Sequence, residues 1–237
     1  MLPNYAKHFA SWVLSRTCIC CGLQSSDSHV DLCASCKTNL PWLQNSCYQC
    51  GLPLELKIDV ILCEHCRNHA QPFNRLCALF SYEPPITTFI NQLKFSKKLY
   101  PGLLFAHLLA QAILYRWYVA QSLPDVIIPV PLHQKRHRRR GYNQALEISI
   151  PLSKKLHIPI AQHACRRVKE TLQQSRLSKI QRADNVDKAF IVDYAFRYKN
   201  VVIVDDVVTT GSTIRAMCMA LQAVGVTNID IWCICRA

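Results

Sequence analysis

An unbroken apolar run at residues 201–204 is followed directly by two carboxylates, Asp205 and Asp206. Such a run is typical of a strand buried on both faces, as in the middle of a parallel sheet. A loop rich in hydroxyl groups and containing one glycine comes next, and apolar residues then recur at helical spacing over residues 214–224. The pattern therefore predicts a buried strand, a polar loop and a helix in immediate succession.

The chain after residue 70 continues this alternation of short apolar runs and helical patterns. Strands are predicted at residues 76–82, 124–131 and 228–235, and helices at residues 86–95, 101–120 and 144–156. Residues 167–190 show little apolar periodicity, and we interpret them as a mobile flap with some helix, because long loops near sites often act as lids. Strands that alternate with helices indicate an α/β fold with a mainly parallel sheet flanked by helices.

The loop after the 201–204 strand is a candidate phosphate site. In open α/β sheets, ligands bind at the carboxyl ends of strands, and helix N-termini hold phosphate groups. The loop lacks the Gly-Lys-Ser/Thr ending of a P-loop and the three glycines of a dinucleotide fingerprint. We predict that backbone N–H groups and hydroxyls of five residues bind a phosphate monoester: Thr209, Thr210, Gly211, Ser212 and Thr213.

The acidic pair Asp205 and Asp206 suits the sugar part of a sugar phosphate. Its carboxylates can accept hydrogen bonds from vicinal sugar hydroxyls and can help to hold Mg²⁺, which prefers carboxylate and phosphate oxygens. The alternative is a buried strand capped by Asp and a turn. Adjacent carboxylates at a strand end repel each other, so a purely structural role explains them poorly.

Eight of the fourteen cysteines lie in the first 66 residues with the spacing of metal ligands. They form four Cys-x-x-Cys pairs: Cys18 and Cys21, Cys33 and Cys36, Cys47 and Cys50, Cys63 and Cys66. The gaps between pairs are 11, 10 and 12 residues. Two such pairs supply the four soft ligands of a tetrahedral zinc site, and Gly22 and Gly51 directly follow two of the pairs, where positive φ helps a tight turn. Sequential pairing predicts two structural zinc sites.

The spacing of these cysteines also fits other uses. A disulfide scaffold is an alternative, although residues 2–15 read as an amphipathic segment and not as a signal peptide. Iron–sulfur binding is another alternative, because cysteine ligands alone do not name the metal. His65 is a weak alternative ligand within the fourth pair. The apolar runs are too short to cross a bilayer, and we expect a cytoplasmic protein.

The net charge of +13 favours a polyanionic partner. Much of it is concentrated at residues 133–140, directly after the predicted strand at 124–131, where we expect a cationic loop. Such a loop suits pyrophosphate, because Arg offers fixed forks to phosphate oxygens. A solvent-facing patch is the alternative, and a nucleic-acid backbone is a further ligand. The candidate nucleic-acid residues are Lys135, Arg136, Arg138, Arg139 and Arg140.

Residues 201–213 resemble the phosphoribosyl-pyrophosphate (PRPP) loop of type I phosphoribosyltransferases, in which a hydrophobic strand, an acidic pair, an apolar pair and Thr-Thr-Gly follow without gaps. Two further blocks strengthen the likeness: Pro129-Val130-Pro131 with residues 140–144, and the spaced Arg, Thr, Gln, Leu, Arg and Asn residues of 167–185. With the cysteine pairs ahead of them, this order resembles the ComF family (ComFC type) of bacterial competence proteins. Tyr142 stands where that family usually has Phe.

The resemblance implies an N-terminal helix and a double zinc ribbon within residues 1–70, and a type I phosphoribosyltransferase domain at residues 71–237. By position, Asp205 and Asp206 would hold ribose hydroxyls and Mg²⁺ and would be the catalytic residues if chemistry occurs. Residues 209–213, with Val207 and Val208 before them, would hold the 5′-phosphate. Pro131 and Arg140 would lie at the pyrophosphate, and Lys94 would approach the same ligand.

The family is linked to natural transformation, in which single-stranded DNA enters the cytoplasm. The resemblance therefore implies a DNA-uptake protein that binds PRPP or another ribose phosphate together with single-stranded DNA. The zinc region is a candidate docking module for a competence helicase or a recombination protein. The alternative function is a PRPP-dependent phosphoribosyltransferase that acts on an unidentified acceptor.

Overall fold

The computed structural model describes residues 17–25, 30–54, 61–96, 98–168 and 189–237. The chain divides into two compact units, residues 1–41 and residues 42–237. The predicted amphipathic segment at residues 2–15 and most of the predicted flap lie outside the described residues. The division into domains at residue 70 stays a prediction.

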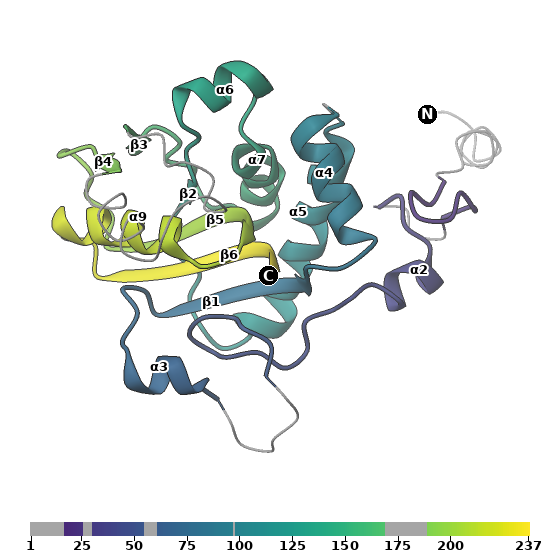
Figure 1. Ribbon diagram of the computed structural model, residues 1–237, viewed down its shortest axis with the longest axis horizontal. Coiled ribbons are helices and arrows are strands. Elements are labelled where there is room, and N and C mark those ends of the chain that lie inside the picture. Colours follow the sequence, from purple (N-terminus) through teal and green to yellow (C-terminus); the bar gives the residue numbers. More distant parts are fainter. Residues whose placement is uncertain (1–16, 26–29, 55–60, 97, 169–188) are drawn as a thin grey trace, which may run out of the picture. The chain divides into compact units, whose positions relative to one another are not determined.

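The larger unit contains a four-stranded sheet in which every neighbouring pair is parallel (Figure 1). Its strands are β1 (Arg75–Ser81), β2 (Val126–Pro129), β5 (Asn200–Val208) and β6 (Asn228–Arg236), in the order β1-β6-β5-β2. The two longest strands lie in the middle, as their nearly continuous apolar sequences require. The predicted α/β fold with a parallel sheet is confirmed.

Helices connect these strands, and all of them except α6 lie close to predicted positions. They are α4 (Ile86–Phe95), α5 (Tyr100–Ala112), α6 (Gln134–Arg140), α7 (Gln144–Leu156) and α9 (Ser212–Ala223). The helix predicted to run to residue 120 ends earlier, because α5 widens into a π-helical turn, η1 (Ile113–Trp117). Tyr118 then leaves the helix, and its hydroxyl accepts a hydrogen bond from Trp232 Nε1 in the core (3.1 Å). Short elements complete the chain: α2 (Ala34–Thr38), α3 (Glu64–Asn68) and the antiparallel pair β3 (Cys165–Arg167) and β4 (Phe190–Val192).

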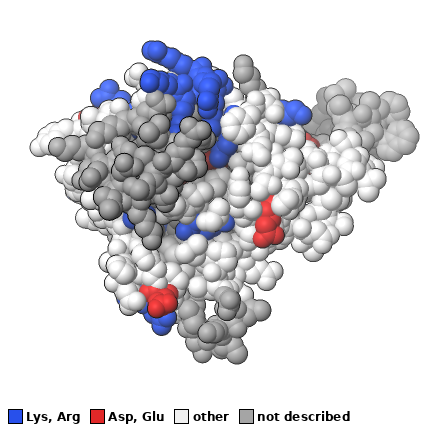
Figure 2. Space-filling view, in the orientation of Figure 1, with Lys and Arg blue, Asp and Glu red and all other residues white. Residues whose placement is uncertain are grey.

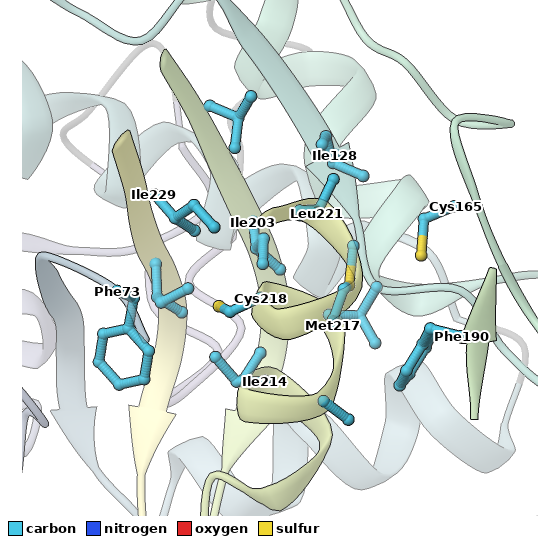
Figure 3. Packing of buried hydrophobic residues seen from close by; sticks show 14 of the residues in the cluster. Phe73, Ile128, Cys165, Phe190, Ile203, Ile214, Met217, Cys218, Leu221 and Ile229 are labelled. Atoms are coloured by element: carbon cyan, nitrogen blue, oxygen red, sulfur yellow. The ribbon is translucent and has the colours of Figure 1, made fainter. Parts of the chain in front are cut away.

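Both faces of the sheet are covered. Helices α5 and α7 pack against β1, β2 and β5. On the other face, α9 and the β3–β4 pair form a core with alternate residues of the sheet strands. Figure 3 shows side chains of α9, among them Met217 and Leu221, packed between Ile203 of β5 and Phe190 of β4. These apolar contacts fix the register of β5 and the start of α9, and so the loop between them.

The segment ahead of β1 also belongs to the larger unit. Trp42 forms a β-bridge with Phe80, and the rings of these two residues lie 4.6 Å apart. The N–H of Leu43 donates to the carbonyl of Leu79 (2.9 Å), and the Leu43 side chain is buried. Residues before the predicted domain boundary therefore pair with the edge of the sheet.

Because all four strands are parallel, their carboxyl ends meet at one edge of the sheet. The segments that follow β1, β2 and β5 begin there, and the chain itself ends there after β6. Within the described ranges, no helix combines the length and the apolar composition that a bilayer span needs.

Candidate functional site

The predicted phosphate loop leaves β5 and enters α9. Strand β5 continues to Val208, two residues beyond the acidic pair, so the carboxylates lie within the strand. Thr209 and Thr210 are exposed, and Gly211 adopts φ +73 immediately before α9. A side chain at this glycine would be strained by the backbone conformation and would lie close to Arg215. The loop is thus a tight turn at a helix N-terminus, as the sequence predicted.

Two arginines hold the carbonyl groups of this loop on one side. Nη1 of Arg236 donates to Val208 O (3.0 Å) and also to Thr209 O. Nη2 of Arg215 donates to Thr210 O (2.9 Å). In a planar trans peptide the C=O and the following N–H point in opposite directions. The N–H groups of Thr209, Thr210 and Gly211 are therefore turned away from the arginines, as a phosphate cradle requires.

Sequence reasoning missed Arg215 and Arg236. In the sequence, Arg236 directly follows the apolar run at 228–235, and Arg215 lies in the first turn of the helix after the loop. These positions do not reveal which carbonyl groups the two side chains contact, because those contacts depend on how the strands are arranged.

Lys94 reaches the acidic pair from α4. Its Nζ lies 2.9 Å from Oδ2 of Asp206, and both side chains are largely buried. Burial acts to lower the pKa of Lys94, but the charges of Asp206 and Asp205 outweigh it and raise that pKa. The ammonium group is therefore held positive beside the predicted ribose site. The resemblance implied that Lys94 approaches the pyrophosphate, which stays a prediction, and the structure gives Asp206 as its ion-pair partner.

The other carboxylate of the pair, Asp205, is disfavoured in its charged form. Burial raises the pKa of Asp205 well above its usual value, and the neighbouring charge of Asp206 adds to this effect. Oδ1 of Asp205 accepts a hydrogen bond from the N–H of Asp206 (2.9 Å). An ionised Asp205 is therefore destabilising until a cation or a hydroxyl-bearing ligand reaches it.

This environment predicts that Asp205→Asn stabilises the ligand-free protein. A carboxylate whose pKa is raised by folding binds more protons in the folded state, so its contribution to stability falls as pH rises above its unfolded value. At pH 8 the variant should melt about 2–4 °C higher than the wild type. The difference should shrink toward pH 3, where the carboxyl group is largely protonated in both the folded and the unfolded state. Thermal unfolding at both pH values tests this prediction. The control is Asp125→Asn, because Asp125 is an exposed residue directly before the first residue of β2. A lower melting temperature for Asp205→Asn at pH 8 would contradict it.

The prediction of a cationic loop at residues 133–140 was wrong, because residues 134–140 form the helix α6. Nδ1 of His133 accepts a hydrogen bond from the N–H of Lys135 (3.3 Å) and caps its start, and Gly141 ends it with φ +84. The proline-containing turn at Pro131 therefore leads into a helix that projects from the sheet edge. Charge composition alone had not revealed these capping residues.

Helix α6 forms a basic surface. Lys135, Arg138 and Arg139 are exposed, and Arg136 is half-buried. Figure 2 shows Lys and Arg side chains gathered over this helix. We call Lys135, Arg136, Arg138 and Arg139 the α6 basic surface.

Arg140 turns from α6 toward the sheet. Its Nη1 donates to Gln144 Oε1 (2.8 Å), and its guanidinium lies 5.3 Å from the ring centre of Phe95, beside Lys94. Burial lowers the pKa of Arg140, while the charge of Asp206 opposes that shift. The structure thus brings Arg140, Lys94 and the acidic pair into one electrostatic neighbourhood.

A pocket of about 480 Å³ lies beside this neighbourhood at the end of β2. Pro131, His133 and His137 line one part, and Asn143, Cys165 and Arg167 line another. Burial lowers the pKa of Arg167, while the charge of Asp205 opposes that shift. The predicted flap would begin at this residue, but residues 169–188 lie outside the described part of the chain.

The cysteine pairs form two clusters with the predicted sequential pairing. The first cluster is Cys18, Cys21, Cys33 and Cys36, in the unit of residues 1–41, and the second is Cys47, Cys50, Cys63 and Cys66, in the unit of residues 42–237. Within each cluster the four sulfur atoms lie within 4.8 Å of one another. All fourteen cysteines are free thiols.

The sulfur positions fit tetrahedral zinc. A Zn–S distance of about 2.3 Å places the sulfur atoms about 3.8 Å apart. The Sγ atoms of Cys21 and Cys33 are 3.8 Å apart, and those of Cys50 and Cys63 are 3.6 Å apart. Gly22 and Gly51 have φ values of +74 and +69, as predicted for these turns. The two four-cysteine clusters are consistent with two structural zinc sites.

One thiol in each cluster is predisposed to ionise. Burial opposes ionisation of Cys18 and Cys47, but nearby backbone N–H groups outweigh it and lower the pKa values to about 6 and about 7, respectively. In the second cluster, burial raises the pKa of Cys50 to about 11. A bound cation is therefore needed to hold all four sulfurs as thiolates.

Comparison with known proteins agrees with this architecture. The phosphoribosyl transferase domain family matches residues 102–237, and the double zinc ribbon domain family matches residues 9–67. The DNA utilization protein YhgH of Shigella flexneri is 36% identical over 220 residues, which cover 92% of this chain and 96% of that protein. The protein of the same name from Escherichia coli strain K12 is 35% identical with the same coverage. Competence protein F of Haemophilus influenzae is 34% identical over 210 residues, which cover 87% of this chain and 90% of that protein. The chain therefore belongs to the ComF family, in which a double zinc ribbon precedes a phosphoribosyl transferase domain.

Proposed function

We propose that this protein binds PRPP with Mg²⁺ at the loop between β5 and α9, binds single-stranded DNA on the α6 basic surface, and acts in the handling of DNA that the cell takes up. The names of its relatives, a competence protein and DNA utilization proteins, support the biological role. The phosphoribosyl transferase domain supports a ribose phosphate as ligand.

The observation that carries the proposal is the meeting of three groups at one sheet edge. The loop N–H groups of residues 209–211 suit the 5′-phosphate, and Asp205 and Asp206 suit the ribose hydroxyls. Lys94 and Arg140 supply positive charge beside them. An anionic phosphate, a polyhydroxyl ring and a second phosphate group are the parts of PRPP, and each has a matching set of side chains or amides.

The acidic pair also fits a bound magnesium ion. Asp205 has a raised pKa and lies in the strand directly before the phosphate loop, so a cation there would relieve its destabilised charge. Magnesium bound with PRPP would neutralise charge on the pyrophosphate group. The ion pair places the positive charge of Lys94 2.9 Å from Asp206, whose carboxylate oxygens suit hydroxyl donors of the ribose.

A calorimetric titration of PRPP in the presence and absence of Mg²⁺ tests the ligand assignment. We expect saturable binding that requires Mg²⁺, and ribose 5-phosphate should bind more weakly because it lacks the pyrophosphate group. Repeating the titration with a short single-stranded oligonucleotide present shows whether the two ligands compete. An absence of heat with PRPP and Mg²⁺ would refute the ligand assignment.

The salt dependence of oligonucleotide binding tests the DNA surface. The slope of log K against log[salt] should change by about 0.7 for each DNA phosphate that the protein no longer neutralises. The double variant Arg138→Gln/Arg139→Gln should therefore bind more weakly and with a slope shallower by about 1.4. Lys154→Gln/Lys155→Gln removes two exposed cations from the end of α7 and is the matched control. If both double variants change the affinity and the salt slope equally, α6 is excluded as the specific binding surface.

Phosphoribosyl transfer is the second candidate function, and the pocket beside β2 favours it. A nucleophilic acceptor in that pocket would form a bond to the anomeric carbon of PRPP as the bond from that carbon to pyrophosphate breaks. Arg140 and Lys94 would stabilise the charge that develops on pyrophosphate. PRPP-dependent release of pyrophosphate that Asp205→Ala/Asp206→Ala abolishes would support transfer, and unchanged release in that variant would exclude these residues from it.

A further inference from the structure

Arg236 joins two sites that lie far apart in the sequence. It is the penultimate residue, closes β6 and is 7% exposed. Its Nε donates to the carbonyl of Cys50 (3.0 Å), a residue of the second cysteine cluster. Its Nη1 donates to the carbonyls of Val208 and Thr209 in the phosphate loop. One buried guanidinium therefore contacts both the candidate zinc site and the candidate phosphate site.

The cluster end of this connection is set by a tight turn. The N–H of Gly51 donates to Cys47 O (2.8 Å), and Gly51 packs so closely on β1 that a Cβ there would lie 2.5 Å from a methyl carbon of Leu76. The Cys50 carbonyl belongs to this turn. Because binding of a structural metal is coupled to the folding of the turns that carry its ligands, we expect the position of that carbonyl to change when metal is lost.

The other end of the connection sets the phosphate loop. The carbonyls of Val208 and Thr209 determine the directions of the N–H groups of Thr209 and Thr210. Burial lowers the pKa of Arg236. A buried guanidinium that loses one carbonyl acceptor shifts toward those that remain, because an unsatisfied buried donor is costly.

We propose that Arg236 couples metal occupancy of the second cysteine cluster to the affinity of the phosphate loop for ribose phosphates. With metal bound, the Cys50 carbonyl holds the guanidinium, and the guanidinium holds the loop N–H groups in the binding arrangement. Without metal, the loop loses this support and its affinity falls. Arg236 is a positioning residue in this scheme, and the scheme rests on the proposed binding of PRPP.

Arg236→Gln tests the loop end directly. We expect the dissociation constant for PRPP and Mg²⁺ to rise about tenfold, within the usual range of coupling between sites, while zinc content stays unchanged. Hydrogen exchange should accelerate in a peptide covering residues 207–213 and stay unchanged in residues 200–204. Arg236→Lys keeps the positive charge but lacks the forked guanidinium group, so its dissociation constant should lie between those of the wild type and Arg236→Gln. Arg197→Gln is the matched control, because Arg197 also donates to backbone carbonyls, those of Tyr194 and Phe196.

A second test leaves Arg236 in place and uses the reciprocity of coupled binding sites. If zinc tightens PRPP binding, PRPP must tighten zinc binding by the same factor. Zinc release to a coloured chelator would be followed in full-length Cys18→Ser/Cys21→Ser protein, so that only the second cluster retains metal. PRPP with Mg²⁺ should raise the chelator concentration needed for half-release by about the same tenfold factor. The further change Arg236→Gln should abolish this effect.

The outcomes separate the two proposals. Failure of the wild type to bind PRPP would refute the proposed ligand. Wild-type binding with an unchanged dissociation constant in Arg236→Gln, or zinc release that PRPP does not alter, would overturn the coupling alone. If Arg236→Gln does not fold, the zinc-release measurement with Arg236 in place decides the question.

Discussion

Asp206→Asn is expected to weaken binding of PRPP and Mg²⁺ about a hundredfold, because hydrogen bonds to a charged group contribute about 1.5–3 kcal/mol each. The carboxylate of Asp206 faces Lys94 at 2.9 Å and is the predicted acceptor for ribose hydroxyls. Asparagine keeps the shape of the side chain but loses the charge and one acceptor. Calorimetric titration of the variant with PRPP and Mg²⁺ measures the effect.

The substitution should also lower stability, because Lys94 would keep a largely buried charge without its partner. The double variant Lys94→Met/Asp206→Asn removes both members of the ion pair and should recover much of the lost stability without recovering affinity. Asp125→Asn, at the opposite end of the sheet, should change neither property. A wild-type dissociation constant in Asp206→Asn would exclude this carboxylate from the ligand site.

Loss of metal from the second cysteine cluster should produce the largest stability effect. Structural zinc contributes about 10–16 kcal/mol of apparent binding free energy in small zinc-binding peptides. This cluster is enclosed by Leu52, Leu54 and Leu62 and packs on β1 through Gly51. Cys66→Ser should therefore reduce bound zinc from two to one per chain and lower the melting temperature by about 10 °C or more, since a few kcal/mol shift it by that amount.

Metal content by elemental mass spectrometry, together with thermal unfolding, tests this expectation. Cys165→Ala is the matched control, because Cys165 is equally buried but lies in β3, away from both clusters. It should keep two zinc ions per chain. Two zinc ions in Cys66→Ser would show that this cysteine is not a ligand, and iron in the purified wild type would identify the site as an iron centre.

The sequence was most informative where neighbouring residues determine the structure. The apolar run at 201–204 with its loop and helix, and the four Cys-x-x-Cys pairs, each contain their own geometric signal. The structure confirms the strand, the helix and the sequential pairing. These features depend on spacing within short segments, which a single sequence displays directly.

Prediction was least successful where distant segments meet. Arg236 contacts Cys50 across 186 positions of sequence, and Lys94 pairs with Asp206 through the parallel arrangement of β1, β6 and β5. The helix α6 was mistaken for a loop, because its run of basic residues has no apolar periodicity and its caps are His133 and Gly141. Contacts of this kind become visible only once the order of the strands is known.

The pairing of Trp42 and Leu43 with β1 has a practical consequence for anyone who trims this protein. A chain shortened to begin at residue 71 would lack the N–H of Leu43, which donates to the carbonyl of Leu79. It would also lack the Trp42 ring that packs on Phe80. Keeping the phosphoribosyl transferase domain in a form suitable for crystallisation or display therefore means starting upstream of Trp42, with the second cysteine cluster included.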